Sequence, residues 1–147
     1  MRWRVKLGVV LSILATVLVT TVVAPTPAMA GGCFSTGCNG KDPQQMLCNQ
    51  PASQVEILDE IWPANIGGKL ELRKSRDCHA AWGRYTNSFG HTGRVEIHGC
   101  GENYCHVMWK TLAAYDEELA WSPMLSFTLW VKACVWSNGY SYCTDTF

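Results

Sequence analysis

The chain has 147 residues, 48% of them hydrophobic, and its 12 Lys and Arg balance its 12 Asp and Glu to a formal net charge of zero. This length suits one domain and is too short for two of ordinary size. The absence of a Lys/Arg run argues against nucleic acid and anionic membrane surfaces as partners. The seven tryptophans, six of them beyond residue 30, argue against disorder.

Residues 1–30 follow the pattern of a secretory signal peptide. Three basic residues (Arg2, Arg4 and Lys6) precede an uncharged apolar run over 7–24, and Ala28-Met29-Ala30 offers the small residues that a signal peptidase reads. We expect cleavage after Ala30, which leaves a weakly acidic chain without a membrane span. Two alternatives stay open: the apolar run is long enough to be retained as an anchor, or Cys33 carries a lipid, which would leave an odd number of thiols.

All eight cysteines lie beyond the export segment. An even thiol count confined to the exported part of a small chain predicts a disulfide framework made in an oxidising compartment. We therefore expect a secreted, extracellular protein. The cysteines are Cys33, Cys38, Cys48, Cys78, Cys100, Cys105, Cys134 and Cys143.

Beyond the export segment, residues 31–52 are rich in Gly, Cys, Asn, Asp and Pro, which indicates a cross-linked loop. Residues 53–147 read as short strands separated by turn signals, and we expect the loop and the strands to form one domain. The expected strands lie at 55–61, 69–73, 78–82, 95–97, 107–109 and 127–135, with a short helix near 113–119. The predicted fold is an all-β, disulfide-stapled antiparallel domain, either a sandwich or barrel-like.

Asn138-Gly139 is the strongest turn signal in the chain and predicts a two-residue type I′ hairpin. With these residues as the loop, 137 pairs with 140 and each earlier residue pairs one step further on. Cys134 then lies directly opposite Cys143 at a non-hydrogen-bonded position, where Cα atoms are about 4.5 Å apart. That distance is within the range a disulfide tolerates.

Cys100 and Cys105 bracket four residues at another predicted turn, so we expect a second hairpin staple there. Cys33, Cys38, Cys48 and Cys78 allow three pairings. Local closure of Cys33 with Cys38, leaving Cys48 to meet Cys78, is the preferred one.

Several segments in chain order resemble the domain-of-unknown-function family 2690, small exported proteins found mostly in actinobacteria. The segments that carry the resemblance are Cys33-x4-Cys38-Asn39-Gly40-Lys41-Asp42-Pro43-x4-Cys48, Leu70-Glu71-Leu72-Arg73-Lys74-Ser75-x2-Cys78-x3-Trp82, Trp121-Ser122-Pro123-Met124 and Ala133-Cys134-Val135-x7-Cys143-Thr144. The resemblance implies a single extracytoplasmic domain and carries no activity. Six of the eight thiols match the family pattern, and Cys100 and Cys105 look like an extra pair.

No catalytic or metal motif stands out. His98-x-Cys100-x4-Cys105-His106 has zinc-type ligands close together, but an oxidising compartment favours a disulfide between its cysteines. The sequence has no Gly-x-Ser-x-Gly and no His-Glu-x-x-His pattern. Glu56, Asp59 and Glu60 fit a general acid/base group and a solvated strand edge equally well, and residues 116–118 are interpreted as a solvated acidic turn rather than a calcium site. We expect no metal, no cofactor and no catalytic residue.

The strand over 127–135 predicts a surface for binding. If Phe127, Leu129, Val131, Ala133 and Val135 face the core, then Trp130, Lys132 and Trp136 point the other way. The two tryptophans are six residues apart, roughly 20 Å along a strand, which suits an extended partner rather than a small pocket. The alternative is that a loop or the Cys-rich segment covers them.

These patterns favour a secreted, non-catalytic binding or structural module of the cell envelope or extracellular space, with a protein or cell-wall glycan as partner. A small secreted enzyme acting on cell-wall material is the first alternative. An extracytoplasmic sensor domain, with the apolar segment retained, is the second.

Overall fold

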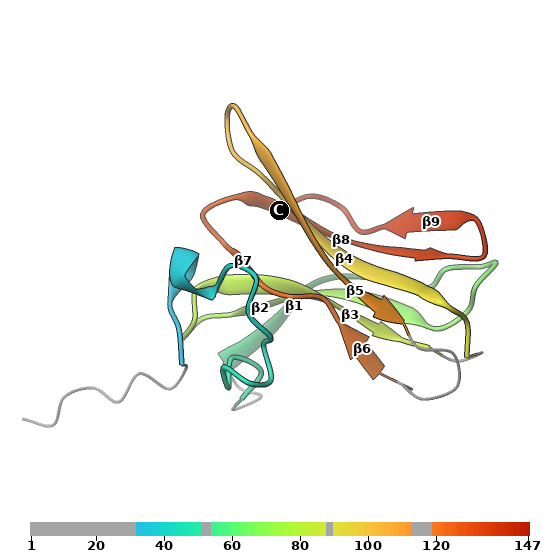
Figure 1. Cartoon of the computed structure of the whole chain (residues 1–147), viewed down its shortest axis with the longest axis horizontal. Coiled ribbons are helices and arrows are strands. Elements are labelled where there is room, and N and C mark those ends of the chain that lie inside the picture. Colours follow the sequence, from blue (N-terminus) through green and yellow to red (C-terminus); the bar gives the residue numbers. More distant parts are fainter. Residues whose placement is uncertain (1–31, 51–53, 88–89, 113–118) are drawn as a thin grey trace, which may run out of the picture.

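The computed structural model describes residues 32–50, 54–87, 90–112 and 119–147, and these form two antiparallel β-sheets packed face to face (Figure 1). In sheet A the strand order is β1 (Val55–Ile61), β2 (Lys69–Ser75), β3 (Ala80–Thr86) and β6 (Leu119–Trp121), and β7 (Leu125–Ser126) pairs with the start of β3. In sheet B the order is β5 (Cys105–Leu112), β4 (Gly93–Cys100), β8 (Trp130–Ser137) and β9 (Tyr140–Cys143). The all-β prediction is confirmed, as a sandwich rather than a closed barrel.

Some of the sequence predictions concern residues that the structure does not describe. The signal peptide, the acidic turn at 116–118 and all but the last residue of the expected helix near 113–119 lie outside the described residues, and Leu119 begins β6. Within the described ranges, none of the helical structure is long and apolar enough to cross a membrane. The only helix described is a 3₁₀ turn, η1 (Ser35–Cys38).

The core lies between the sheets because each central strand points alternate residues inward. Sheet B contributes Val95 and Ile97 from β4 and Val131, Ala133 and Val135 from β8, all fully buried. Sheet A contributes mainly Leu70, Leu72, Ala81 and Tyr85. Gly83 lets the layers approach closely, since a Cβ there would lie 2.9 Å from the backbone oxygen of Glu96.

The expected strand over 127–135 is wrong at its start. The strand begins at Trp130, and residues 127–129 form a turn after β7. The Ser126 hydroxyl accepts a hydrogen bond from the backbone N–H of Thr128 at 3.3 Å, and Leu129 N–H donates to the Ser126 carbonyl at 3.3 Å. These local bonds favour a turn over an extended strand. The inward placement of Leu129, Val131, Ala133 and Val135 is nevertheless confirmed by their burial.

The C-terminal hairpin is as predicted. Ser137 pairs with Tyr140 and Cys134 with Cys143, and Asn138 and Gly139 both have positive φ, at 51° and 81°, as a type I′ turn requires. Cys134 and Cys143 form a disulfide with a Cα–Cα distance of 4.1 Å. The other disulfides join Cys33 to Cys38, Cys48 to Cys78 and Cys100 to Cys105, which are the expected pairings.

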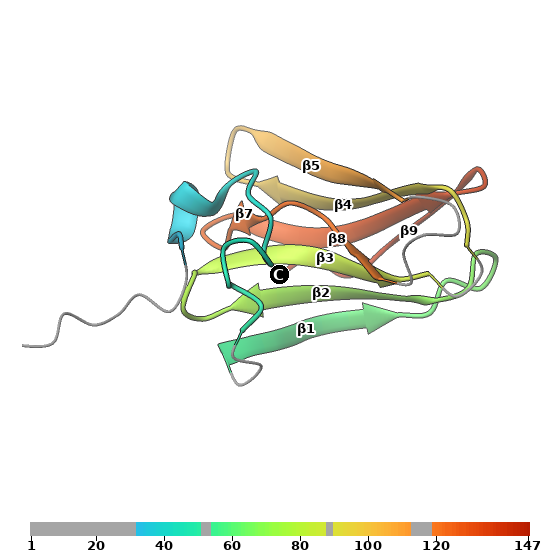
Figure 2. The same cartoon turned by 60° about the horizontal axis from the view of Figure 1, so that its bottom comes forward.

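The N-terminal loop is a structural part of sheet A. It crosses the outer face of this sheet near the start of β3, as Figure 2 shows in cyan. Gly40 N–H donates to the Met124 carbonyl at 2.9 Å, and Met124 N–H donates to that of Lys41 at 2.8 Å. A second small core forms beneath the loop, from Cys33, Cys38, Cys48, Cys78, Ala80, Trp82 and Met124. The loop therefore covers an outward tryptophan, Trp82, that would otherwise face water.

The strand expected to be half-buried at 69–73 is covered on both sides. Glu71, on the outward side of β2, is only 1% exposed. Its carboxylate lies 2.6 Å from Lys69 Nζ and accepts a hydrogen bond from Arg84 Nε, also at 2.6 Å. Long cationic side chains thus shield it, which residue alternation alone does not reveal.

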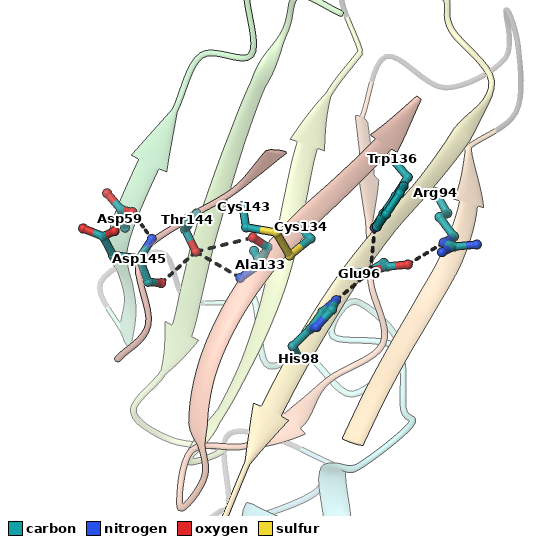
Figure 3. The surroundings of a disulfide bond; sticks show 10 residues. All are labelled: Asp59, Arg94, Glu96, His98, Ala133, Cys134, Trp136, Cys143, Thr144 and Asp145. Atoms are coloured by element: carbon teal, nitrogen blue, oxygen red, sulfur yellow. Dashed lines mark hydrogen bonds and ion pairs between the residues drawn. A yellow bond between two sulfur atoms is a disulfide. The ribbon is translucent and has the colours of Figure 1, made fainter. Parts of the chain in front are cut away.

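The C-terminal tail runs beside β8 toward sheet A. Val131 and Phe147 exchange backbone hydrogen bonds of 2.8 and 2.9 Å, and the Thr144 hydroxyl accepts one from the backbone N–H of Ala133 at 3.0 Å. Asp145 N–H then donates to the Asp59 carboxylate on β1 at 2.9 Å (Figure 3). The tail therefore ties the edge of sheet B to the edge of sheet A.

The Cys48–Cys78 disulfide, which joins the loop to the sheet, should stabilise the fold more than the Cys100–Cys105 disulfide does. Cys48–Cys78 closes 30 residues of chain, whereas Cys100–Cys105 closes five. Chain entropy predicts a loss of about 3.5 kcal/mol for Cys48→Ala with Cys78→Ala and about 2 kcal/mol for Cys100→Ala with Cys105→Ala. Urea denaturation of both double variants measures this. Equal losses, or the reverse order, would contradict the structural role given to the loop.

Candidate functional site

The outer face of sheet B carries three exposed tryptophans on two strands. Trp109 of β5 is 54% exposed, and Trp130 and Trp136 of β8 are 68% and 42% exposed. Between them lie the outward residues of β4 and Lys132 of β8. We call this surface the tryptophan face and define it by Arg94, Glu96, His98, Trp109, Trp130, Lys132 and Trp136.

The residues singled out from the sequence lie where they were expected. Trp130, Lys132 and Trp136 share one face of β8, and their neighbours Val131 and Val135 point inward. The alternative, that the Cys-rich segment covers the tryptophans, is not what the described residues show, because that segment packs on sheet A. A role in binding stays a prediction.

The part of the face that β4 and β5 contribute was not predicted from the sequence. Glu96 of β4 pairs with Trp109 on one side and Cys134 on the other, so all three point outward in one row across the sheet. A signal for this was available, since Val95 and Ile97 alternate with Arg94, Glu96 and His98. The pairing order of the strands, which brings β4 next to β8, could not be predicted from that alternation.

Glu96 is the centre of the face. Glu96 is only 2% exposed although its side chain is on the outward side of β4. Arg94 Nε donates to Oε1, and Trp136 Nε1–H donates to Oε2 at 3.0 Å (Figure 3). His98 Nε2 lies 2.6 Å from the same Oε2. Three side chains from two strands are therefore oriented by one carboxylate, including the ring of Trp136.

Glu96 stays ionised in this setting. Burial by itself raises the pKa of its carboxyl group, but the hydrogen bonds from His98 and Arg94, together with the Arg94 charge, outweigh burial and lower the pKa below its ordinary value of 4.5. Glu71 in sheet A behaves in the same way: burial raises its pKa, and hydrogen bonds from Arg84 and Lys69 lower it further than burial raises it. Each sheet thus holds one buried, paired carboxylate.

Arg94 lies between two tryptophan rings. Its guanidinium carbon is 5.3 Å from the ring centre of Trp136 and 5.9 Å from that of Trp109, within the range of cation–π attraction. The three side chains border an open depression of about 430 Å³. Thr111 and the β8–β9 turn, with Asn138 and Tyr140, also line the depression.

The residues weighed as metal ligands are used otherwise. Cys100 and Cys105 form a disulfide, so the pattern around His98 and His106 lacks the thiolates that zinc would take. Glu96, His98 and Cys134 place ligand atoms within 4.8 Å of one another, but Cys134 is also in a disulfide. Of the three, only the carboxylate and the imidazole remain as donors.

The acids of β1 contact different partners rather than one another. Glu56 lies 3.7 Å from Arg76 and Glu60 lies 3.5 Å from Lys69, while Asp59 accepts a hydrogen bond from the tail. Each has a different partner along an edge strand. The ring of His79 packs against Phe34 and Phe127, at centroid distances of 5.7 and 6.3 Å.

A family model described as "Protein of unknown function (DUF2690)" matches residues 36–134, about two thirds of the chain. The chain belongs to this family. The part matched to DUF2690 runs from η1 into β8 and includes most of the tryptophan face, with Trp136 just beyond its end. No curated protein and no solved structure shows a significant match.

The buried carboxylate should make stability depend on pH. Because the folded pKa of Glu96 is below 4.5, its contribution is present above that pH and is lost as the pH falls through the folded pKa. We expect Glu96→Gln to lower the free energy of unfolding by about 1–3 kcal/mol at neutral pH. The difference from the unchanged protein should shrink as the pH falls from 4.5 through the lower folded pKa of Glu96, because its carboxyl then becomes protonated and both side chains are neutral. Urea denaturation across this range is the measurement.

Glu56→Gln is the matched control, since the Glu56 side chain is 44% exposed and its ion pair with Arg76 is on the surface. Its effect should stay within about 0.5 kcal/mol at every pH. A loss in Glu96→Gln that is the same at all pH values would show that its charge is not what stabilises the fold.

Proposed function

We propose that this DUF2690 protein is a secreted, non-catalytic binding module of the cell envelope or extracellular space, and that the tryptophan face is its binding surface. The observation that carries the proposal is the exposure of three tryptophans on one face, at 54%, 68% and 42%. Exposed aromatic clusters of this kind are typical of interaction sites, where tryptophan is a frequent hot spot.

The shape of the face favours an extended partner. Trp130 and Trp136 are at opposite ends of β8, roughly 20 Å apart at the rise of a β-strand. Trp109 lies between those ends, one strand beyond β4. A polymer or a broad protein surface can contact all three, whereas a small molecule cannot.

The disulfides support export. All eight cysteines are paired, and four disulfides in a chain of this size indicate an oxidising environment. Cleavage of residues 1–30 and release outside the cell are the simplest route to that environment.

The geometry gives less support to the enzyme alternative. Among the described residues of sheet B, Glu96 and His98 are the one outward pair in which a carboxylate contacts an imidazole. A general acid needs a raised pKa, and that of Glu96 is lowered by its hydrogen bonds. Glu96 therefore suits the orientation of neighbouring side chains better than proton transfer. The sensor alternative shares the same face and differs only in whether the apolar segment is retained.

Affinity capture with the oxidised protein tests the proposal. Culture supernatant and cell-wall fractions provide the candidate partners, identified by mass spectrometry and then titrated. We expect one enriched protein or wall polymer, and substitution of Trp130→Ala with Trp136→Ala should weaken its binding by at least about 30-fold, because two hot-spot side chains are removed.

Trp62→Ala is the matched control. Trp62 is 69% exposed but follows β1 of sheet A, beside Lys69, so binding through sheet B should be unchanged. Circular dichroism confirms that each variant folds. Equal weakening by Trp62→Ala and by the pair on β8 would argue against the tryptophan face, and an unchanged affinity in the β8 pair would refute it.

A further inference from the structure

The depression between Trp109 and Trp136 has a cation at its centre, and this points to the class of ligand. Arg94 uses its Nε to reach Glu96, and its side chain is 46% exposed. Among the described residues, no other hydrogen bond of the guanidinium is formed, so its terminal nitrogens face the depression or solvent. They can donate two parallel hydrogen bonds to a carboxylate, a geometry in which arginine is preferred over lysine.

The charge on the face favours an anion. The outward positions of β4, β5, β8 and β9 hold two cations, Arg94 and Lys132, and one anion, Glu96. Glu96 is 2% exposed and is engaged by Arg94, His98 and Trp136, so what the face presents to solvent is positive charge. This differs from the exported part of the chain as a whole, in which Asp and Glu outnumber Lys and Arg.

The walls of the depression favour a sugar. Two indole rings border it, and polar side chains at its rim come from Thr111, Asn138 and Tyr140. A pyranose ring has a flat apolar C–H face and a polar edge, so it can stack on an indole while its hydroxyl groups reach the rim. The depression is open and shallow, which suits a ring lying on a surface better than a peptide side chain inserted into a pocket.

We propose that this depression binds a carboxylate-bearing sugar residue of a glycan. The sugar ring stacks on Trp109 or Trp136, and its carboxylate accepts hydrogen bonds from the terminal nitrogens of Arg94. Lys132 and Trp130, further along β8, contact later units of the same acidic polymer. The inference rests on the proposed binding function and narrows its partner to an acidic glycan.

Paired ligands that differ only in charge give the direct test. The full exported chain, oxidised, is titrated with oligogalacturonate and with its methyl ester. It is also titrated with solubilised cell-wall glycan strands before and after chemical reduction of their carboxyl groups. At least one acidic form should bind about tenfold or more tightly than its neutral counterpart, the factor expected for a charge-assisted hydrogen bond.

Substitution of Arg94 tests whether this side chain causes the preference for acidic over neutral ligands. Arg94→Gln should lower the acidic-to-neutral affinity ratio severalfold and leave only the smaller preference due to Lys132, while Arg76→Gln, an exposed residue directly after β2 of sheet A, should leave the ratio unchanged. Trp130→Ala should weaken both forms equally, because Trp130 lies at the opposite end of the face. The comparison of acidic and neutral ligands uses the unchanged protein, so it remains decisive even if Arg94→Gln fails to fold.

The outcomes separate this inference from the proposed function. Equal binding of both forms, abolished by the tryptophan substitutions, overturns the acidic ligand and leaves the binding module in place. Binding of an acidic peptide such as poly-glutamate, with no acidic sugar preferred to its neutral form, overturns the glycan. An acidic preference that is undiminished by Arg94→Gln in a folded protein overturns the role of Arg94.

Discussion

The Cys48–Cys78 disulfide holds the N-terminal loop on the outer face of sheet A, and the asymmetry of the domain depends on that attachment. A two-layer sandwich has two outer faces, and each here carries outward tryptophans. On sheet A the loop and the second small core bury Trp82 to 1% exposure. On sheet B no described segment does the same, so Trp109, Trp130 and Trp136 remain in contact with solvent. The cross-link, the hydrogen bonds between the loop and Met124 and the second small core together leave the outer face of sheet B as the more exposed one.

The side chains of the tryptophan face are held in place by the Glu96 carboxylate rather than by a covering loop. Glu96 accepts hydrogen bonds from Arg94 and Trp136 and contacts His98, so side chains of two strands are held in fixed positions around it (Figure 3). An arginine between two indoles is less free to rotate than one in solvent, which lowers the entropy lost when a ligand binds. The same carboxylate thus also fixes the side chains of the proposed binding surface.

Glu71 and Glu96 show that buried carboxylates serve both sheets in similar ways. Each is shielded by long or aromatic side chains, and each has its pKa lowered by hydrogen bonds in spite of burial. Removing one partner of such a group leaves a charge without compensation, which is the reason these pairs are strongly coupled to folding. They differ in what surrounds them: cationic side chains and the edge of β1 near Glu71, exposed tryptophans near Glu96.

Much of the local structure could be predicted from the sequence, although residues 127–129 form a turn instead of the expected strand. Asn138-Gly139 predicted the turn and, through the period of two in a strand, placed Cys134 opposite Cys143. The same period separated Trp130, Lys132 and Trp136 from the core residues of β8. The order of the strands in each sheet and the covering of one outer face could be known only from the folded chain. Those depend on contacts between distant segments: β4 beside β8 brings Arg94 and Glu96 to Trp136, and the loop beside β3 covers Trp82. Spacing along one strand carries no information about such pairings, because they are set by packing between layers.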